Sequence, residues 1–242
     1  MQTLPRKPAI SNLIADQSLI LIGTVHGDPL GFARAGKLLV HLKPDIVTVE
    51  ISPFSLRYRL KHGSGWQRQL TKVLSQFPPA AVRHLAIQRL VAQVALPFEV
   101  RAARDYQRST GVPWRPLDLG GLARRHLPRY GSELLTLANL QALLATSAGT
   151  LTEFVAAEFH QARLALAGSP RRLLTSGTKE MLRRERFLAR RLRTLASRFC
   201  RLVHLGGWEH VVAWQDAAGL WRDLADLQPR RMLLDDADRL LA

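Results

Sequence analysis

The sequence predicts an α/β fold in which a central, mainly parallel sheet is flanked by helices. Short apolar, β-branched runs typical of buried strands alternate with longer segments whose apolar residues follow helical spacing. The first two such strands, at 18–24 (SLILIGT) and 46–51 (IVTVEI), are separated by one helical segment at 29–42. A strand–helix–strand unit of this kind predicts parallel pairing through a right-handed crossover.

Length and composition indicate one domain with a large helical part. The chain has 242 residues, of which 47% are apolar, so it can bury a sizeable core and we expect a single domain over 1–242. A long helical insertion is expected in the middle of the chain, roughly at 60–110 and 130–198, because helix-forming segments dominate there.

Three further strands are expected, at 112–118, 199–205 and 230–234. The prolines in the segment 112–118 predict that this strand is short or lies at the edge of the sheet. After the second, the glycine pair 206–207 is expected to turn the chain, and a helix is expected to begin at His210.

The net charge of +16 comes almost entirely from arginine. Such an excess attracts nucleic acid, anionic lipid or acidic substrates, so an anionic partner is one expectation. The arginines are spread along the whole chain, however, and are not interleaved with aromatic residues as in single-strand binding proteins. We therefore expect most of them on solvated helix faces.

The sequence predicts a cytoplasmic protein without a membrane span. No stretch approaches the ~20 apolar residues that a spanning helix needs. The apolar run near the N-terminus is short and leads into the first strand, so it is interpreted as a strand and not as a signal peptide. The single cysteine, Cys200, excludes an intramolecular disulfide and is expected to be a small core residue.

Polar side chains follow the predicted strands at the points where the strands end. His26, Glu50, Asp118 and His210 each lie at or just beyond one strand. Ligands of open α/β sheets bind outside the carboxyl ends of parallel strands, so we expect these four side chains at one edge. Imidazole and carboxylate together suit zinc, manganese or iron.

Two of these segments share the pattern G-x-x-H after an apolar strand. They are Gly23–His26 and Gly207–His210, near opposite ends of the chain. Each glycine is expected to let the backbone turn sharply and present the histidine in the loop. Three structural alternatives remain open. The histidines could be core residues bound by backbone groups, Glu50 could only cap a helix at Ser52-Pro53, and Asp118 could only cap a helix near Gly120.

A further carboxylate is predicted to point inward from a helix over 178–199. Glu185 falls on the apolar stripe of that helix, which includes Leu188 and Leu192. A buried carboxylate is costly unless it is paired or binds a cation. A salt bridge with the adjacent Arg186 is the structural alternative to a functional role.

Four segments together resemble the TraB/GumN/Tiki family, in the family's order. They read LILIGTVHGDPLGFARAGKLLVHLKPDIVTVEI, FEVRAARDYQRSTGVPWRPLDL, EMLRRERFLARRL and LVHLGGWEHVVAW. The resemblance implies a fold shared with erythromycin esterases and ChaN-like haem-binding proteins. It also implies a divalent-metal site formed by His26, His210 and Glu50, with Glu185 and Arg186 as further polar members.

The expected function is therefore that of a metal-dependent hydrolase, peptidase-like or esterase-like, which uses Mn, Zn or Co. Glu50 or Glu185 would be the general base and the other a ligand, while Arg186 or Arg57 would stabilise the oxyanion. Arg57 and Arg59 could also hold a carboxylate or phosphate of the substrate. Two other functions remain open: a non-catalytic ligand-binding or regulatory protein, and an arginine-driven binder of nucleic acid or anionic surfaces.

Overall fold

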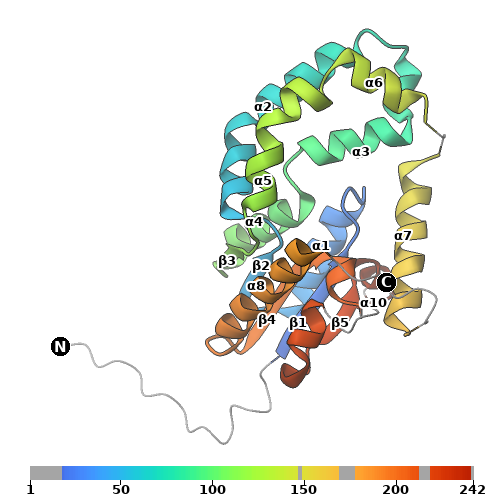
Figure 1. Ribbon diagram of the computed structural model, residues 1–242. Helices are drawn as coiled ribbons and strands as arrows, with labels where there is room; N and C mark the ends of the chain where they lie inside the picture. Colours follow the sequence, from blue (N-terminus) through green and yellow to red (C-terminus); the bar gives the residue numbers. More distant parts are fainter. Residues whose placement is uncertain (1–17, 147–148, 169–177, 213–218, 241–242) are drawn as a thin grey trace, which may run out of the picture.

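The computed structural model describes residues 18–146, 149–168, 178–212 and 219–240, and it confirms the predicted α/β fold. Five parallel strands form one sheet in the order β3-β2-β4-β1-β5 (Figure 1). The strands are β1 (Ser18–Thr24), β2 (Ile46–Val49), β3 (Trp114–Pro116), β4 (Arg201–Gly207) and β5 (Arg230–Leu233). The proline-containing β3 lies at one edge, as predicted, because proline lacks the amide that a central strand must donate.

The centre of the sheet is buried on both faces. β1 and β4 pair along their whole length, from Ser18 opposite Arg201 to Thr24 opposite Gly207. All four residues of β2 are buried, which explains why the run at 46–49 is apolar and β-branched instead of alternating with polar residues.

Helices cover both faces because the direction of the chain through the sheet reverses after β3. From β1 through β2 to β3 the chain moves toward one edge, and from β3 through β4 to β5 it moves back. Right-handed crossovers then place the sheet-packed helices that follow β1 and β2 on one face and those that directly flank β4 on the other, while the short helix after β5 packs against the first helix. The helices packed on the sheet are α1 (Gly31–Leu42), α4 (Phe98–Thr110), α7 (Leu151–Leu166), α8 (Lys179–Ala196), α9 (Leu220–Asp223) and α10 (Ala237–Leu240). In agreement, α1 packs against α4, whereas α8 packs against β4 and α9.

A second group of helices lies beyond the sheet and has its own small core (Figure 1). It consists of α2 (Pro53–Leu74), α3 (Leu85–Val94), α5 (Gly121–His126) and α6 (Leu137–Leu144), joined by short 3-10 and π turns. Trp66, Ile87 and Leu140 are among the residues buried between them. α3, α6 and most of α2 fall within the predicted helical insertion, whereas α4, α7 and α8, which the prediction also included, pack on the sheet.

The end of β4 corrects one prediction. Gly206 and Gly207 do not turn the chain but extend β4, where they pair with Gly23 and Thr24 of β1. Gly23, also predicted to turn the chain, likewise lies inside β1, and a Cβ atom there would lie 2.9 Å from the Cα of Trp208, so close approach explains the glycine at this position. A short 3-10 turn, Trp208–His210, follows the strand, and most of the helix predicted after it lies outside the described residues.

A second correction concerns Cys200, which is exposed just before β4 and is not a core residue. Burial begins with the strand itself, at Leu202, so the thiol lies outside the apolar layer that the strand enters. Among the helices that the structure describes, none is long and apolar enough to cross a membrane.

The contact between α1 and α4 gives a stability prediction. A Cβ atom on Gly31 would lie 2.6 Å from two ring atoms of the buried Phe98, whereas one on Gly36, in the same helix, would meet nothing within 4 Å. We expect Gly31→Ala to lower the free energy of unfolding by ~1–3 kcal/mol, as overpacked core substitutions do. Gly36→Ala is expected to raise it by roughly 0.5–1 kcal/mol. Urea unfolding of both variants checks this, and equal effects would contradict the packing argument.

Candidate active site

The four predicted side chains lie at the carboxyl edge of the sheet, as expected. Glu50 directly follows β2, and Asp118 follows β3. His26 and His210 follow β1 and β4, which are neighbours in the sheet. The chain leaves β1 toward the face covered by α1 and leaves β4 toward the face covered by α9. Such a divergence opens the crevice at which α/β proteins bind ligands.

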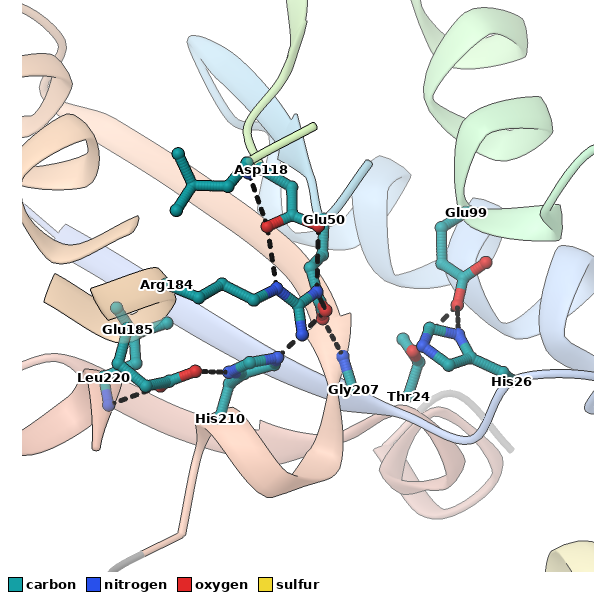
Figure 2. Close-up of polar contacts among 11 residues, drawn as sticks. Thr24, His26, Glu50, Glu99, Asp118, Arg184, Glu185, Gly207, His210 and Leu220 are labelled. Carbon is teal, nitrogen blue, oxygen red and sulfur yellow. Dashed lines mark hydrogen bonds and ion pairs between the residues drawn. The ribbon is translucent and has the colours of Figure 1, made fainter. Parts of the chain in front are cut away.

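Glu50 is the centre of a buried ionic network (Figure 2). Its side chain is only 5% exposed and accepts a hydrogen bond of 2.6 Å from the backbone N–H of Gly207. The other carboxylate oxygen contacts His210 Nε2 at 3.0 Å and forms an ion pair with Arg184. Glu50 does not cap α2, because the hydroxyl of Ser52 accepts the hydrogen bond at that position.

His210 lies between two carboxylates. Its Nε2 faces Glu50, and its Nδ1 lies 2.6 Å from Glu185 Oε1. Carboxylates only accept hydrogen bonds, so this arrangement holds a proton on both ring nitrogens. Burial by itself lowers the pKa of His210, but the charges of Glu50 and Glu185 outweigh it and raise the pKa to about 10. Glu185 also accepts a hydrogen bond of 2.8 Å from the backbone N–H of Leu220.

Arg184 joins the network to Asp118. It donates from Nε to Asp118 Oδ1 at 2.7 Å and from Nη2 to Oδ2 at 3.0 Å, a bidentate geometry. Burial opposes the charged form of Glu50, but His210 and Arg184 outweigh it and hold the pKa of Glu50 well below its usual value. Burial raises the pKa of Asp118, against the opposing effect of Arg184. Glu50 and His210 are thus both charged at neutral pH.

His26 belongs to a separate, smaller group with Glu99 and Thr24 (Figure 2). Its Nδ1 lies 3.0 Å from Glu99 Oε1, and the hydroxyl of Thr24 donates to the same oxygen at 2.8 Å. Glu99 is buried, whereas the His26 side chain is 64% exposed. Because the carboxylate can only accept, Nδ1 carries the proton and Nε2 is left for another partner.

The two groups meet above the end of β4. A Cβ atom on Gly207 would lie 3.6 Å from Glu50 Oε2, 3.7 Å from His26 Nε2 and 3.8 Å from His210 Cδ2. A Cβ atom on Gly206 would lie 2.9 Å from Glu50 Oε2, so this residue must be glycine for the carboxylate to reach its position. The structure therefore brings His26, Glu50 and His210 together, as predicted.

The site opens into a large cavity between the sheet edge and the second group of helices. Its volume is about 1150 Å³, and its wall includes His26, Glu50, Glu99, Asp118 and Arg184. Glu185 and His210 lie behind this wall and do not line the cavity. Desolvation by the protein atoms around the partly exposed ring lowers the pKa of His26, but the hydrogen bond and charge of Glu99 and the charge of Glu50 outweigh it and raise that pKa to about 9.

The donor atoms expected to hold a divalent metal are mostly engaged with the protein. Both nitrogens of His210 face carboxylates, and both oxygens of Glu50 have partners, one of them the permanently charged Arg184. Of the expected ligands, His26 alone presents a nitrogen, Nε2, without a described partner. Among the described residues, no group of three or more His, Cys, Asp or Glu has the arrangement of a metal site. In this arrangement the three side chains do not fit a divalent cation.

Of the three predicted arginines, only Arg59 lies in the site. Arg57 and Arg186 are exposed and do not line the cavity, whereas Arg59 and Arg184 do. The partner of Glu185 is His210 and not Arg186, so the inward orientation of Glu185 is confirmed with a different partner.

Sequence reasoning missed Glu99 and Arg184. Glu185 was identified by its position on the apolar stripe of a helix, and the same criterion applies to Glu99. It shares the buried face of α4 with Ala102, Ala103 and Tyr106. No comparable signal identified Arg184. Arginines precede and follow Glu185 in the sequence, and only the packing of α8 decides which of them reaches Glu50.

Comparisons of this chain with protein-family models, with curated proteins and with solved structures find no match. The resemblance to TraB/GumN/Tiki proteins therefore stays a prediction from the quoted segments, and the site has to be interpreted from its own geometry.

Proposed function

We propose that this protein is a hydrolase of carboxylic esters or amides in which His26, oriented by Glu99, transfers the proton. The observation that carries the proposal is the His26–Glu99 pair at the mouth of a large cavity. A buried carboxylate fixes Nδ1 of an exposed imidazole, so that Nε2 is free for a bound molecule. Convergent titratable groups with shifted pKa values in a cleft are typical of catalytic sites.

The chemistry follows from this geometry. Neutral His26 accepts a proton at Nε2 from a water molecule as the water oxygen attacks the carbonyl carbon. The protonated ring then gives that proton to the departing oxygen or nitrogen as the bond to the acyl carbon breaks. The products are an acid and an alcohol or amine. Glu99 stabilises the imidazolium that forms between the two transfers, as a carboxylate does in hydrolase triads.

Arg184 supplies the positive charge that the developing oxyanion needs. It lines the cavity, and its Nη1 makes no hydrogen bond with any described residue, while Nε and Nη2 are held by Asp118 and Glu50. A donor whose position is fixed in advance requires no reorganisation when negative charge forms on the substrate. Glu50 and His210 act in this proposal as positioning residues for Arg184.

His26→Ala is expected to lower kcat/KM by roughly 10²–10⁴-fold, the usual contribution of a general base. A panel of chromogenic esters and anilides identifies the substrate class, and the variant is assayed on the best member. His41→Ala is the control, because His41 is an exposed histidine of α1 away from the cavity. Equal activity of the His26→Ala variant and the wild type would exclude His26 as the base.

The pH dependence separates a catalytic pair from a structural one. A general base must be deprotonated, and the pKa of His26 is raised to about 9, so kcat/KM is expected to rise with pH and level off above that value. In Glu99→Gln the amide keeps an acceptor oxygen but removes the charge. The rising limb should then move toward the ordinary histidine value of 6.5. A limb that stays in place would show that Glu99 does not act on the catalytic proton.

The same proposal predicts that activity does not require a divalent metal. Dialysis against a chelator is expected to leave the hydrolysis rate unchanged, and Mn, Zn or Co should not increase it, because the donors of Glu50 and His210 are engaged. Elemental analysis of untagged protein is the accompanying measurement. A stoichiometric divalent ion that is lost in the His26→Ala/His210→Ala double variant would instead support the metal-dependent mechanism predicted from the sequence.

A further inference from the structure

The charges that line the cavity are unevenly paired. Five carboxylates contribute to its wall, and each has a cationic partner in the protein. The pairs are Asp28 with Arg34, Glu50 and Asp118 with Arg184, Glu99 with His26, and Glu180 with Arg125. Every carboxylate of the wall therefore has a cationic contact within the protein, with Arg184 shared by Glu50 and Asp118.

The cavity arginines, by contrast, largely lack such partners. Arg59, Arg89, Arg101 and Arg183 line the cavity, and none of them forms an ion pair with a described carboxylate. Arg89 lies 4.4 Å from the ring centre of Phe154, and Arg101 lies 5.4 Å from that of Phe32. Stacking on a ring orients a guanidinium but leaves its charge uncompensated.

Arg59 is the most buried of the four. It donates from Nη1 to the backbone oxygens of Gln93 at 2.6 Å and Ala95 at 3.0 Å, which are neutral acceptors. Burial lowers the pKa of Arg59, and the nearby Tyr130 opposes this only in part. A desolvated cation without a counter-ion is costly, and a bound anion would relieve that cost.

The rest of the wall combines neutral polar side chains (Ser52, Ser55, Gln88 and Gln93) with a larger number of apolar ones. Besides the arginines, the lining includes Val91, Ala92, Leu96, Phe98, Leu119 and Leu122. At about 1150 Å³ the cavity exceeds the ~300–1,000 Å³ of ordinary small-molecule pockets, so it has room for a ligand with an extended apolar part.

From this combination we infer that the cavity binds an amphipathic organic anion, in which an apolar chain lies on the α3 side and a carboxylate or phosphate is held by the unpaired arginines. The inference rests on the proposed hydrolase function in one respect: the scissile ester or amide bond of such a molecule would lie beside His26. The binding of the anion itself does not require catalysis.

The first experiment measures binding without turnover. Dodecyl phosphate and dodecanoate, which contain no carboxylic ester or amide bond, are titrated by calorimetry into the full-length wild-type protein, below the concentration at which they form micelles. Dodecyltrimethylammonium and dodecanol provide the same chain with a positive charge or none. We expect both anions to bind at one site, about tenfold or more tighter than the cation and the alcohol. Equal affinity for the anions and the cation would overturn the inference.

Two double variants with the same charge change test the arginines. Arg101→Gln/Arg183→Gln removes one cavity arginine from α4 and one from α8. Arg104→Gln/Arg190→Gln removes two exposed arginines from the same helices that do not line the cavity. The first pair is expected to weaken binding of dodecyl phosphate about tenfold or more, and the second by less than about twofold. Equal losses would show that net charge, and not the cavity, attracts the anion.

Hydrolysis assays and binding measurements together distinguish failure of the inference from failure of the proposed function. If the wild type hydrolyses esters but does not prefer those with an anionic group, the proposed function holds and this inference fails. If dodecyl phosphate binds as expected but no ester or amide is cleaved, the cavity is an anion-binding site and the proposed hydrolase is wrong.

Discussion

The structure at the carboxyl edge of the sheet depends on the burial of one charge, that of Glu50. A carboxylate at this depth is stable only if every oxygen lone pair has a partner and the charge is compensated. The backbone of β4, the ring of His210 and the guanidinium of Arg184 meet these needs together. These three partners belong to a strand, to the turn that follows it and to a helix. The ion pair between Glu50 and Arg184 therefore also fixes the position of α8 relative to β2 and β4. Gly206 is part of the same requirement, because any side chain there would displace the carboxylate.

This network and the His26–Glu99 pair have different physical characters, although they adjoin each other. The network is buried, and its charges are compensated by permanent or strongly stabilised cations, so it is suited to hold positions and not to exchange protons. His26 is exposed, has one nitrogen fixed and the other available, and borders the cavity. A rigid charged scaffold beside one accessible proton carrier is the arrangement that general acid–base catalysis requires.

The large arginine excess is not used uniformly. Several arginines form ion pairs on the surface, such as Arg125 with Glu180 and Arg193 with Asp226, where solvent screening makes each pair worth little. Four of those that line the cavity, Arg59, Arg89, Arg101 and Arg183, differ in that they have no acidic partner among the described residues. The positive charge that is prominent in the composition is therefore concentrated around one cavity, where Arg59 is half-buried and Arg89, Arg101 and Arg183 are exposed.

The sequence by itself determined the strands, the parallel sheet and the edge at which polar residues collect. These features depend on local patterns: apolar β-branched runs, helical spacing, and the rule that ligand-binding residues follow parallel strands. It also showed that Glu185 points inward. Only the tertiary structure decided which charges meet. The partner of Glu185 is His210 and not Arg186, Arg184 and not Arg186 reaches Glu50, and the orienting group of His26 is Glu99. Ion pairs form between side chains that are far apart in the chain, and their choice depends on ångström-level packing that no local pattern encodes.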